Sequence, residues 1–167
     1  MLAARLIRLI EDHSEELTRK VLRDLTTNPR TRSFQSVPRD ELESRIGDLY
    51  RNLGAWIGDP RDEAVQAEYE AWGRRRLRQG ILLSEIVYAL LLIKHHLARY
   101  IREHGLVEFS GDAAPLGDYL PVHLHGLQEL SHMVGEFFDR ALYYLARGYE
   151  AEARVASNVG GAFGSTS

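Results

Sequence analysis

The sequence contains no cysteine among its 167 residues. Disulfides, thiolate metal sites and cysteine nucleophiles are therefore excluded, and the absence fits a reducing cytoplasm. A surplus of positive charge is also missing, because the net charge is −3 and the pI is about 6.2. Proteins that bind nucleic acid usually carry such a surplus for phosphate contacts. We expect no nucleic-acid partner.

The sequence also lacks a membrane-spanning run, which needs about 20 mostly apolar residues. Charged residues interrupt the apolar pattern of the N-terminus, whereas a signal peptide has an uninterrupted apolar stretch. The serines lie mainly in loops and at the end of the chain, with no nucleophile motif around them. We therefore expect a soluble cytoplasmic protein without membrane contact, catalytic residues or cofactor.

Apolar residues recur at spacings of three and four through most of the chain, which predicts an all-α fold of about five to six helices. The segment 80–102 is the most apolar, and nearly every residue from Ile86 to Ile93 is apolar. A helix that is apolar all round is enclosed by its neighbours. We therefore interpret this segment as the central core helix, which approaches the surface at Lys94.

Helix start, stop and turn residues predict helices over residues 2–26, 38–58, 59–80, 84–104 and 118–157, with loops at 26–37 and 105–117. Asp59 followed by Pro60 predicts a helix start, Gly80 a helix end, and Ser84 an N-cap. We assign residues 1–156 to one domain and residues 157–167, rich in glycine and serine, to a flexible tail or linker stub.

The last helix is unusually long, since forty residues at 1.5 Å per residue span roughly 60 Å. This exceeds the expected size of the domain. Either the helix breaks, with Gly126 and Gly135 as candidate positions, or its end projects beyond the body of the protein.

Two adjacent histidines, His95 and His96, lie in the central helix and are the candidate cofactor-binding residues. One histidine on the inner face of a helical domain is able to ligate haem, as in globins. The alternative is a partly buried imidazole that is hydrogen-bonded to a carbonyl or a tyrosine. Binding of haem or another small ligand thus remains a second hypothesis for the function of the domain.

A second polar group comprises His125, Glu129, His132 and Glu136, which share one face of the last helix. Helical di-iron proteins use Glu-x-x-His pairs from two helices. Only one such pair occurs here, so a metal-dependent oxidase is the weakest hypothesis and we assign no metal site. A solvated polar face is the default interpretation.

Arginines 74, 75, 76 and 78 form a basic cluster at the end of the third predicted helix. Such a cluster is able to bind phosphate, but positive side chains also stabilise the negative end of a helix dipole. We favour the second interpretation, in which these side chains are solvated.

Apolar and aromatic residues occupy more than one side of the last helix, whereas a single core needs only one stripe. The extra residues favour a partner helix, most simply the same helix of a second copy in a two-fold dimer. A helix clasped by neighbours of its own domain is the alternative. The predicted dimer surface comprises Phe137, Phe138, Leu142, Tyr144, Leu145 and Tyr149.

Three segments, Ile10 to Thr18, Trp72 to Lys94 and Glu136 to Glu150, resemble a bacterial sensory family. This family is the N-terminal domain of the RsbR/RsbD co-antagonists of the stressosome, and the resemblance covers roughly residues 5–152. It implies a dimeric, non-haem, globin-like fold whose long last helix leads to an output module or a regulatory partner protein. No output module follows Ser167, so we expect either part of a longer protein or a stand-alone member.

The resemblance implies a non-enzymatic sensory or regulatory input domain. We hypothesise that a signal shifts the dimer helices between two packings and passes along the last helix.

Overall fold

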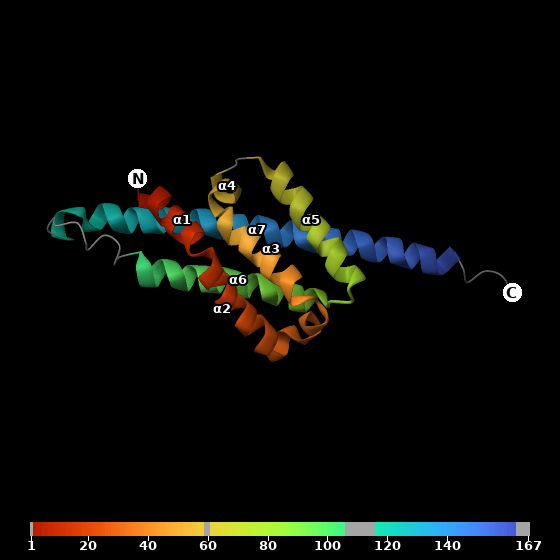
Figure 1. Ribbon diagram of the computed structural model, residues 1–167. Helices are drawn as coiled ribbons and strands as arrows, with labels where there is room; N and C mark the ends of the chain where they lie inside the picture. The colour runs from red at the N-terminus through yellow and green to blue at the C-terminus, as the bar shows by residue number, and fades with distance from the viewer. Residues whose placement is uncertain (1, 59–60, 106–115, 163–167) are drawn as a thin grey trace.

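The computed structural model describes residues 2–58, 61–105 and 116–162 (Figure 1). Within these ranges the chain forms seven α-helices and one 3-10 helix, joined by short turns, and has no strand. The prediction of an all-α fold with a long C-terminal helix is confirmed. The elements, in order, are α1 (Leu2–Asp12), α2 (Ser14–Thr27), η1 (Pro29–Ser36), α3 (Arg39–Arg51), α4 (Leu53–Gly58), α5 (Asp62–Arg78), α6 (Leu83–His104) and α7 (Leu116–Ala162).

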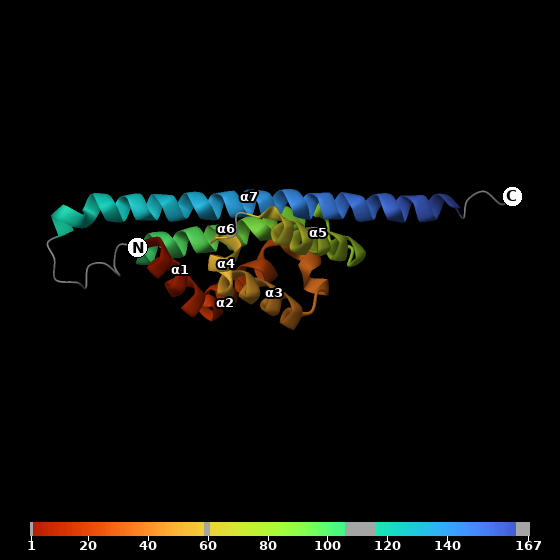
Figure 2. The ribbon, with the colours of Figure 1, turned by 90° about the horizontal axis from the view of Figure 1, so that it is seen from above.

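The other helices pack on one side of α7, which forms a long rod along one edge of the molecule (Figure 2). Helix α6 lies between α7 and the layer that contains α2 and α3 (Figure 2). Helix α5 crosses α7 nearer its C-terminal end, and α1 and α4 contact it farther toward its N-terminus. The opposite side of α7 is left uncovered by the rest of the described chain.

Helix α6 is the central core helix, as the sequence predicts. Its buried side chains include Ile86, Leu90, Ile93 and Leu97, and no residue from Ile86 to Ile93 is exposed. The fully buried Tyr50 of α3 donates a hydrogen bond from its hydroxyl to the carbonyl oxygen of Ile93 at 2.8 Å. A buried hydroxyl needs such a partner to offset its lost hydration, and this bond fixes α3 against α6.

Two of the predicted helices are each divided in two. The predicted helix over 2–26 bends at His13, whose φ and ψ of −104° and 19° lie outside the helical range. The predicted helix over 38–58 is interrupted at Asn52, where φ is −112° and the side-chain amide donates to the carbonyl of Asp48. Side chains that bond locally to the backbone compete with the helix, and the apolar periodicity does not reveal the change of direction.

The predicted loop after α2 contains the 3-10 helix η1. The Asn28 side chain caps it by accepting a hydrogen bond from the backbone N–H of Arg30 at 3.0 Å. The buried Thr31 has non-helical backbone angles and donates from its hydroxyl to the carbonyl of Leu25 at 2.7 Å. This short element packs against α6.

The turn between α5 and α6 follows the prediction at its glycine but not at its cap. Gly80 has φ +75°, the left-handed conformation that glycine adopts without strain, and it closes α5. The prediction of Ser84 as the N-cap is wrong, because α6 begins at Leu83 and its cap position is Leu82. The predicted start of the previous helix at Asp59 and Pro60 lies outside the described residues.

Helix α7 is continuous over its 47 residues, so it has no break at Gly126 or Gly135. At 1.5 Å per residue it is about 70 Å long. Its C-terminal turns extend beyond all other described helices (Figure 2), so the projecting alternative is confirmed. The helix continues to Ala162, into the predicted tail over 157–167. Residues 163–167 lie outside the described part, and the division of the chain at residue 156 stays a prediction.

Candidate functional site

The contact between α5 and α7 is the most extensive helix pairing in the described chain. Gly73 of α5 lies against the α7 backbone, where an added Cβ would clash with the carbonyl oxygen of Leu145 and approach the nitrogen of Tyr149 to 2.7 Å. Gly148 of α7 lies against the α5 backbone, where a Cβ would clash with the carbonyl of Glu70. Both glycines are needed because the two backbones touch.

Ion pairs hold α5 to α7 on either side of this crossing. Near the start of α5, Asp62 accepts a hydrogen bond from Arg140 at 2.6 Å and one from the hydroxyl of Tyr144 at 2.9 Å. At the other end, Arg78 donates to Glu152 at 2.8 Å. The Arg140 guanidinium holds the pKa of Asp62 below its ordinary value, and the hydrogen bond to Asp62 raises the pKa of Tyr144. Position and direction of α7 against α5 are thus set at two separate points.

Three of the residues predicted to contact a second copy are instead buried in the core of this chain. Phe137, Phe138 and Leu145 are each less than 4% exposed. The ring of Phe137 stacks on Trp56 of α4 at 6.2 Å and meets Tyr69 of α5 edge-on at 5.9 Å. The chain's own helices therefore cover these three side chains, and the dimer prediction has to rest on other residues.

The remaining residues of the predicted dimer surface, Leu142, Tyr144 and Tyr149, are half-buried. The Tyr149 hydroxyl donates to the carbonyl of Ile81 at 2.9 Å and so anchors α7 to the turn after α5. Large exposed apolar side chains nevertheless gather on α7. Six of the seven in the described chain lie there, namely Leu120, Val122, Leu124, Tyr143, Val155 and Val159.

The two candidate histidines occupy different environments. His95 is exposed, whereas the side chain of His96 is 14% exposed and faces α2. Nε2 of His96 lies 3.1 Å from a carboxylate oxygen of Asp24. The two histidines therefore do not share one binding slot. His96 is partly buried, as the alternative interpretation has it, but its partner is the carboxylate of Asp24 rather than a carbonyl or a tyrosine.

The interior beneath α6 has little free space. A cavity of about 30 Å³ lies there, lined mainly by apolar side chains such as Phe34, Leu90 and Ile93. Pockets for small organic ligands measure roughly 300–1,000 Å³, whereas one water needs about 30 Å³ of liquid. A planar macrocycle such as haem does not fit into this cavity without separating the helices.

The candidate metal ligands are spread along the uncovered side of α7. His125, Glu129, His132 and Glu136 are all exposed, and the closest approach that the structure gives among them is 3.5 Å between His132 and Glu136. Among the described residues, no group of three histidine, aspartate or glutamate side chains lies close enough together to hold a metal ion.

Each arginine of the basic cluster has a carboxylate partner. Arg74 pairs with Glu70 at 3.5 Å, while Arg75 and Arg76 share Glu41 at 2.8 and 2.9 Å. The prediction of solvated side chains is wrong for Arg76, whose side chain is 6% exposed. The hydrogen bond from Arg75 is the main cause that lowers the pKa of Glu41 to about 2. The cluster therefore joins α5 to α3 through Glu41 and to α7 through Arg78, and it holds few free donors for phosphate.

Sequence reasoning missed the pair of Asp24 and His96 and the crossing glycines. Asp24 and His96 are 72 positions apart and leave no local signal. The glycines leave a weak signal in the sequence. A glycine inside a helix lowers helix stability by up to about 1 kcal/mol relative to alanine, and a close backbone approach explains why it is there. Gly73 and Gly148 are such positions, and we considered only Gly126 and Gly135 as possible breaks.

Comparison with curated proteins and with solved structures gave no match. No helix of the described residues combines the length and apolar character that crossing a membrane requires. A family model, described as the RsbT co-antagonist protein rsbRD N-terminal domain, matches residues 11–158. The match covers most of the chain and includes the α5–α7 crossing and the central helix. The chain therefore belongs to the rsbRD N-terminal domain family, signalling input domains of the stressosome type.

Proposed function

We propose that this domain is a non-enzymatic sensory input that acts through protein–protein contacts, as a homodimer joined along α7. The observation that carries the proposal is the one-sided packing of α7. The other helices cover one side of the rod, and most of the exposed large apolar side chains of the described chain lie on α7 itself. Apolar side chains gathered on one element mark a surface for a partner.

The size of α7 suits this role. A stable protein interface buries about 800 Å² on each partner, and a rod of about 70 Å offers such an area along its uncovered side. Tyr143 lies near the middle of α7 with 58% of its surface exposed. Aromatic residues of this kind are enriched at the centres of interfaces.

The proposed mechanism is a change in how two α7 helices pack. The C-terminal turns of α7 extend away from the body, which leaves their side chains accessible to a protein that receives the signal (Figure 2). A signal that binds one packing more tightly than the other shifts the equilibrium between them. The ion pairs at Asp62 and Arg78 couple such a shift in α7 to α5.

The dimer is tested by light scattering after size-exclusion chromatography at micromolar concentration, with a charge introduced at Tyr143. The proposal expects a dimer for the wild type and a monomer for Tyr143→Glu. Leu82→Glu is the matched control, because Leu82 is equally exposed at 59% but lies in the turn before α6. A monomeric wild type, or equal loss of dimer in both variants, would contradict the proposal.

A further inference from the structure

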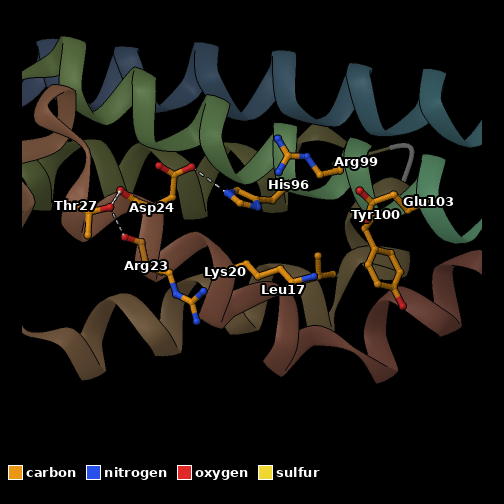
Figure 3. Close-up of a pocket in the computed structure, with 9 residues that line it drawn as sticks. All are labelled: Leu17, Lys20, Arg23, Asp24, Thr27, His96, Arg99, Tyr100 and Glu103. Carbon is orange, nitrogen blue, oxygen red and sulfur yellow. Dashed lines mark hydrogen bonds and ion pairs between the residues drawn. The ribbon is translucent and has the colours of Figure 1, made fainter.

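A groove between α2 and α6 is large enough to hold a small molecule (Figure 3). Its volume is about 460 Å³, within the roughly 300–1,000 Å³ of small-molecule pockets. Two buried side chains, Leu17 and Tyr100, form its apolar part, and charged side chains line the remainder. We propose that this groove binds a small organic anion that carries a phosphate or carboxylate group.

The first argument is the arrangement of positive charges. Arg23 and Lys20 line the groove from α2, and Arg99 lines it from α6, beside His96 (Figure 3). Lys20 pairs with Glu16 at 3.0 Å. Arg23 and Arg99 form no ion pair and no side-chain hydrogen bond with the rest of the described chain, so both guanidinium groups are available to a ligand. Guanidinium groups bind carboxylate and phosphate oxygens in a bidentate geometry, with two parallel N–H···O hydrogen bonds.

The second argument is the fixed imidazole of His96 in the wall of the groove. Nε2 of His96 lies 3.1 Å from Asp24, and the Asn28 amide donates to the other oxygen of the same carboxylate at 3.4 Å. The Asn28 amide therefore orients the Asp24 carboxylate, and the carboxylate orients the imidazole of His96. A polar group that is held in place before a ligand arrives costs the complex less ordering entropy.

The charges that remain free favour a ligand of modest negative charge. Lys20 is already paired with Glu16, so the cations left for a ligand are the guanidinium groups of Arg23 and Arg99. Of the two carboxylates in the lining, Asp24 is engaged with His96 and Asn28. Glu103 and the hydroxyl of Thr27 add acceptors at the edge of the groove. The buried Tyr100 and Leu17 favour a carbon skeleton over an inorganic ion. A hydroxylated organic phosphate or carboxylate has all three properties: a negative charge for the guanidinium groups, hydroxyl donors for the acceptors, and a carbon skeleton for the apolar part.

Binding at this groove would join α2 to α6, which lies against α7. The site is argued from the groove alone and stands whether or not the domain dimerises or signals. The two claims also fail separately, because ligand binding is measured on the protein alone in any oligomeric state.

The test is isothermal titration calorimetry at constant ionic strength with four probes: glucose 6-phosphate, inorganic phosphate, succinate and uncharged glucose. We expect saturable binding of glucose 6-phosphate or succinate, and which of them binds distinguishes phosphate from carboxylate. Glucose should not bind, and inorganic phosphate should bind more weakly than the organic anion. Failure of every anion to bind at millimolar concentration overturns the proposal, as does equal binding of inorganic phosphate and both organic anions.

Four variants locate the binding. Arg23→Gln and Arg99→Gln should each weaken the organic anion about tenfold or more, which corresponds to about 1.4 kcal/mol for a charge-assisted pair. Arg19→Gln and Arg102→Gln are matched controls, since both arginines are exposed on the same two helices but do not line the groove. Equal weakening in all four variants would show nonspecific attraction and overturn the proposal. Circular dichroism verifies that each variant is folded.

Discussion

Gly73 of α5 and Gly148 of α7 lie at the same helix crossing. At each glycine, the backbone of the opposite helix occupies the space that a side chain would need. The distance between the two helices is therefore set by the absence of two Cβ atoms. Interhelical distances usually measure 8–10 Å and depend on the side chains at the contact. Any larger residue at either position has to push the helices apart or shift one along the other.

The first prediction concerns this crossing. Gly148→Ala should lower the free energy of unfolding by about 2 kcal/mol, because the new methyl group meets the backbone of Glu70, which is unable to move aside. Urea denaturation followed by circular dichroism measures the change. Gly135→Ala on the same helix is the control, since nothing lies within 4 Å of its added Cβ. The control should be neutral or stabilise by up to about 1 kcal/mol, and a neutral Gly148→Ala would contradict the close approach.

The second prediction concerns the pH dependence of stability through Glu41. Its pKa in the folded protein is about 2, lowered from 4.5 mainly by the hydrogen bond from Arg75. A depressed folded-state pKa gives stability that is complete above the unfolded pKa and is lost as the pH falls through the folded pKa. The contribution of Glu41 should therefore decline between pH about 4.5 and about 2.

Urea denaturation of Glu41→Gln at several pH values tests this contribution. The variant should be less stable than wild type by about 2 kcal/mol near neutral pH, because buried Arg76 loses its charged partner. The difference should shrink as the pH falls toward about 2. Glu43→Gln, on the exposed side of the same helix, is the matched control and should change the free energy of unfolding near neutral pH by less than about 0.5 kcal/mol. A difference that is constant with pH would contradict the assigned ion pairs.

The third prediction concerns the bond between α3 and α6. Tyr50→Phe should lower the free energy of unfolding by about 1 kcal/mol, the usual net value of a hydrogen bond, because the Ile93 carbonyl loses a donor in the core. Tyr88→Phe is the control, since among the described residues the hydroxyl of Tyr88 meets only the Arg30 side chain, near the surface and at 3.4 Å. Equal effects of the two substitutions would argue against the buried bond.

The fourth prediction concerns haem. Added haem should give no saturable Soret band that depends on a histidine ligand, because the core cavity of about 30 Å³ is too small and the groove beside His96 is strongly charged. Absorbance titrations of the wild type and of His96→Ala measure this directly. A stoichiometric Soret band that disappears in His96→Ala would contradict the prediction and restore the haem hypothesis.

Helical periodicity carried most of the fold prediction. The apolar run from Ile86 to Ile93 identifies the core helix, and Gly80 identifies the turn before it. The bends at His13 and Asn52 were not predictable in the same way. Apolar residues continue with nearly the same spacing across both, and tertiary packing decides where the axis turns.

The candidate site was less predictable because it depends on which helices meet. The aromatic residues of α7 suggest a partner, but the sequence does not tell whether Trp56 and Tyr69 of the same chain or a second copy cover Phe137. The groove was equally hard to predict, because its lining depends on which helices pack against each other. Arg23 and Arg99 are unremarkable surface arginines until α2 and α6 are placed side by side.

The crossing near Gly148 divides α7 into two arms of unequal length. The arm that leads from Gly148 to Ala162 measures about 21 Å, and the arm toward Leu116 about 48 Å. Helices α1, α4 and α6 pack against the longer arm and hold it in place, whereas the shorter arm extends beyond the other described helices. A bend of about 10° at this crossing moves the C-terminal tip sideways by roughly 4 Å. A small bend at the glycine contact is thus enough to change which side chains meet the C-terminal end of the rod.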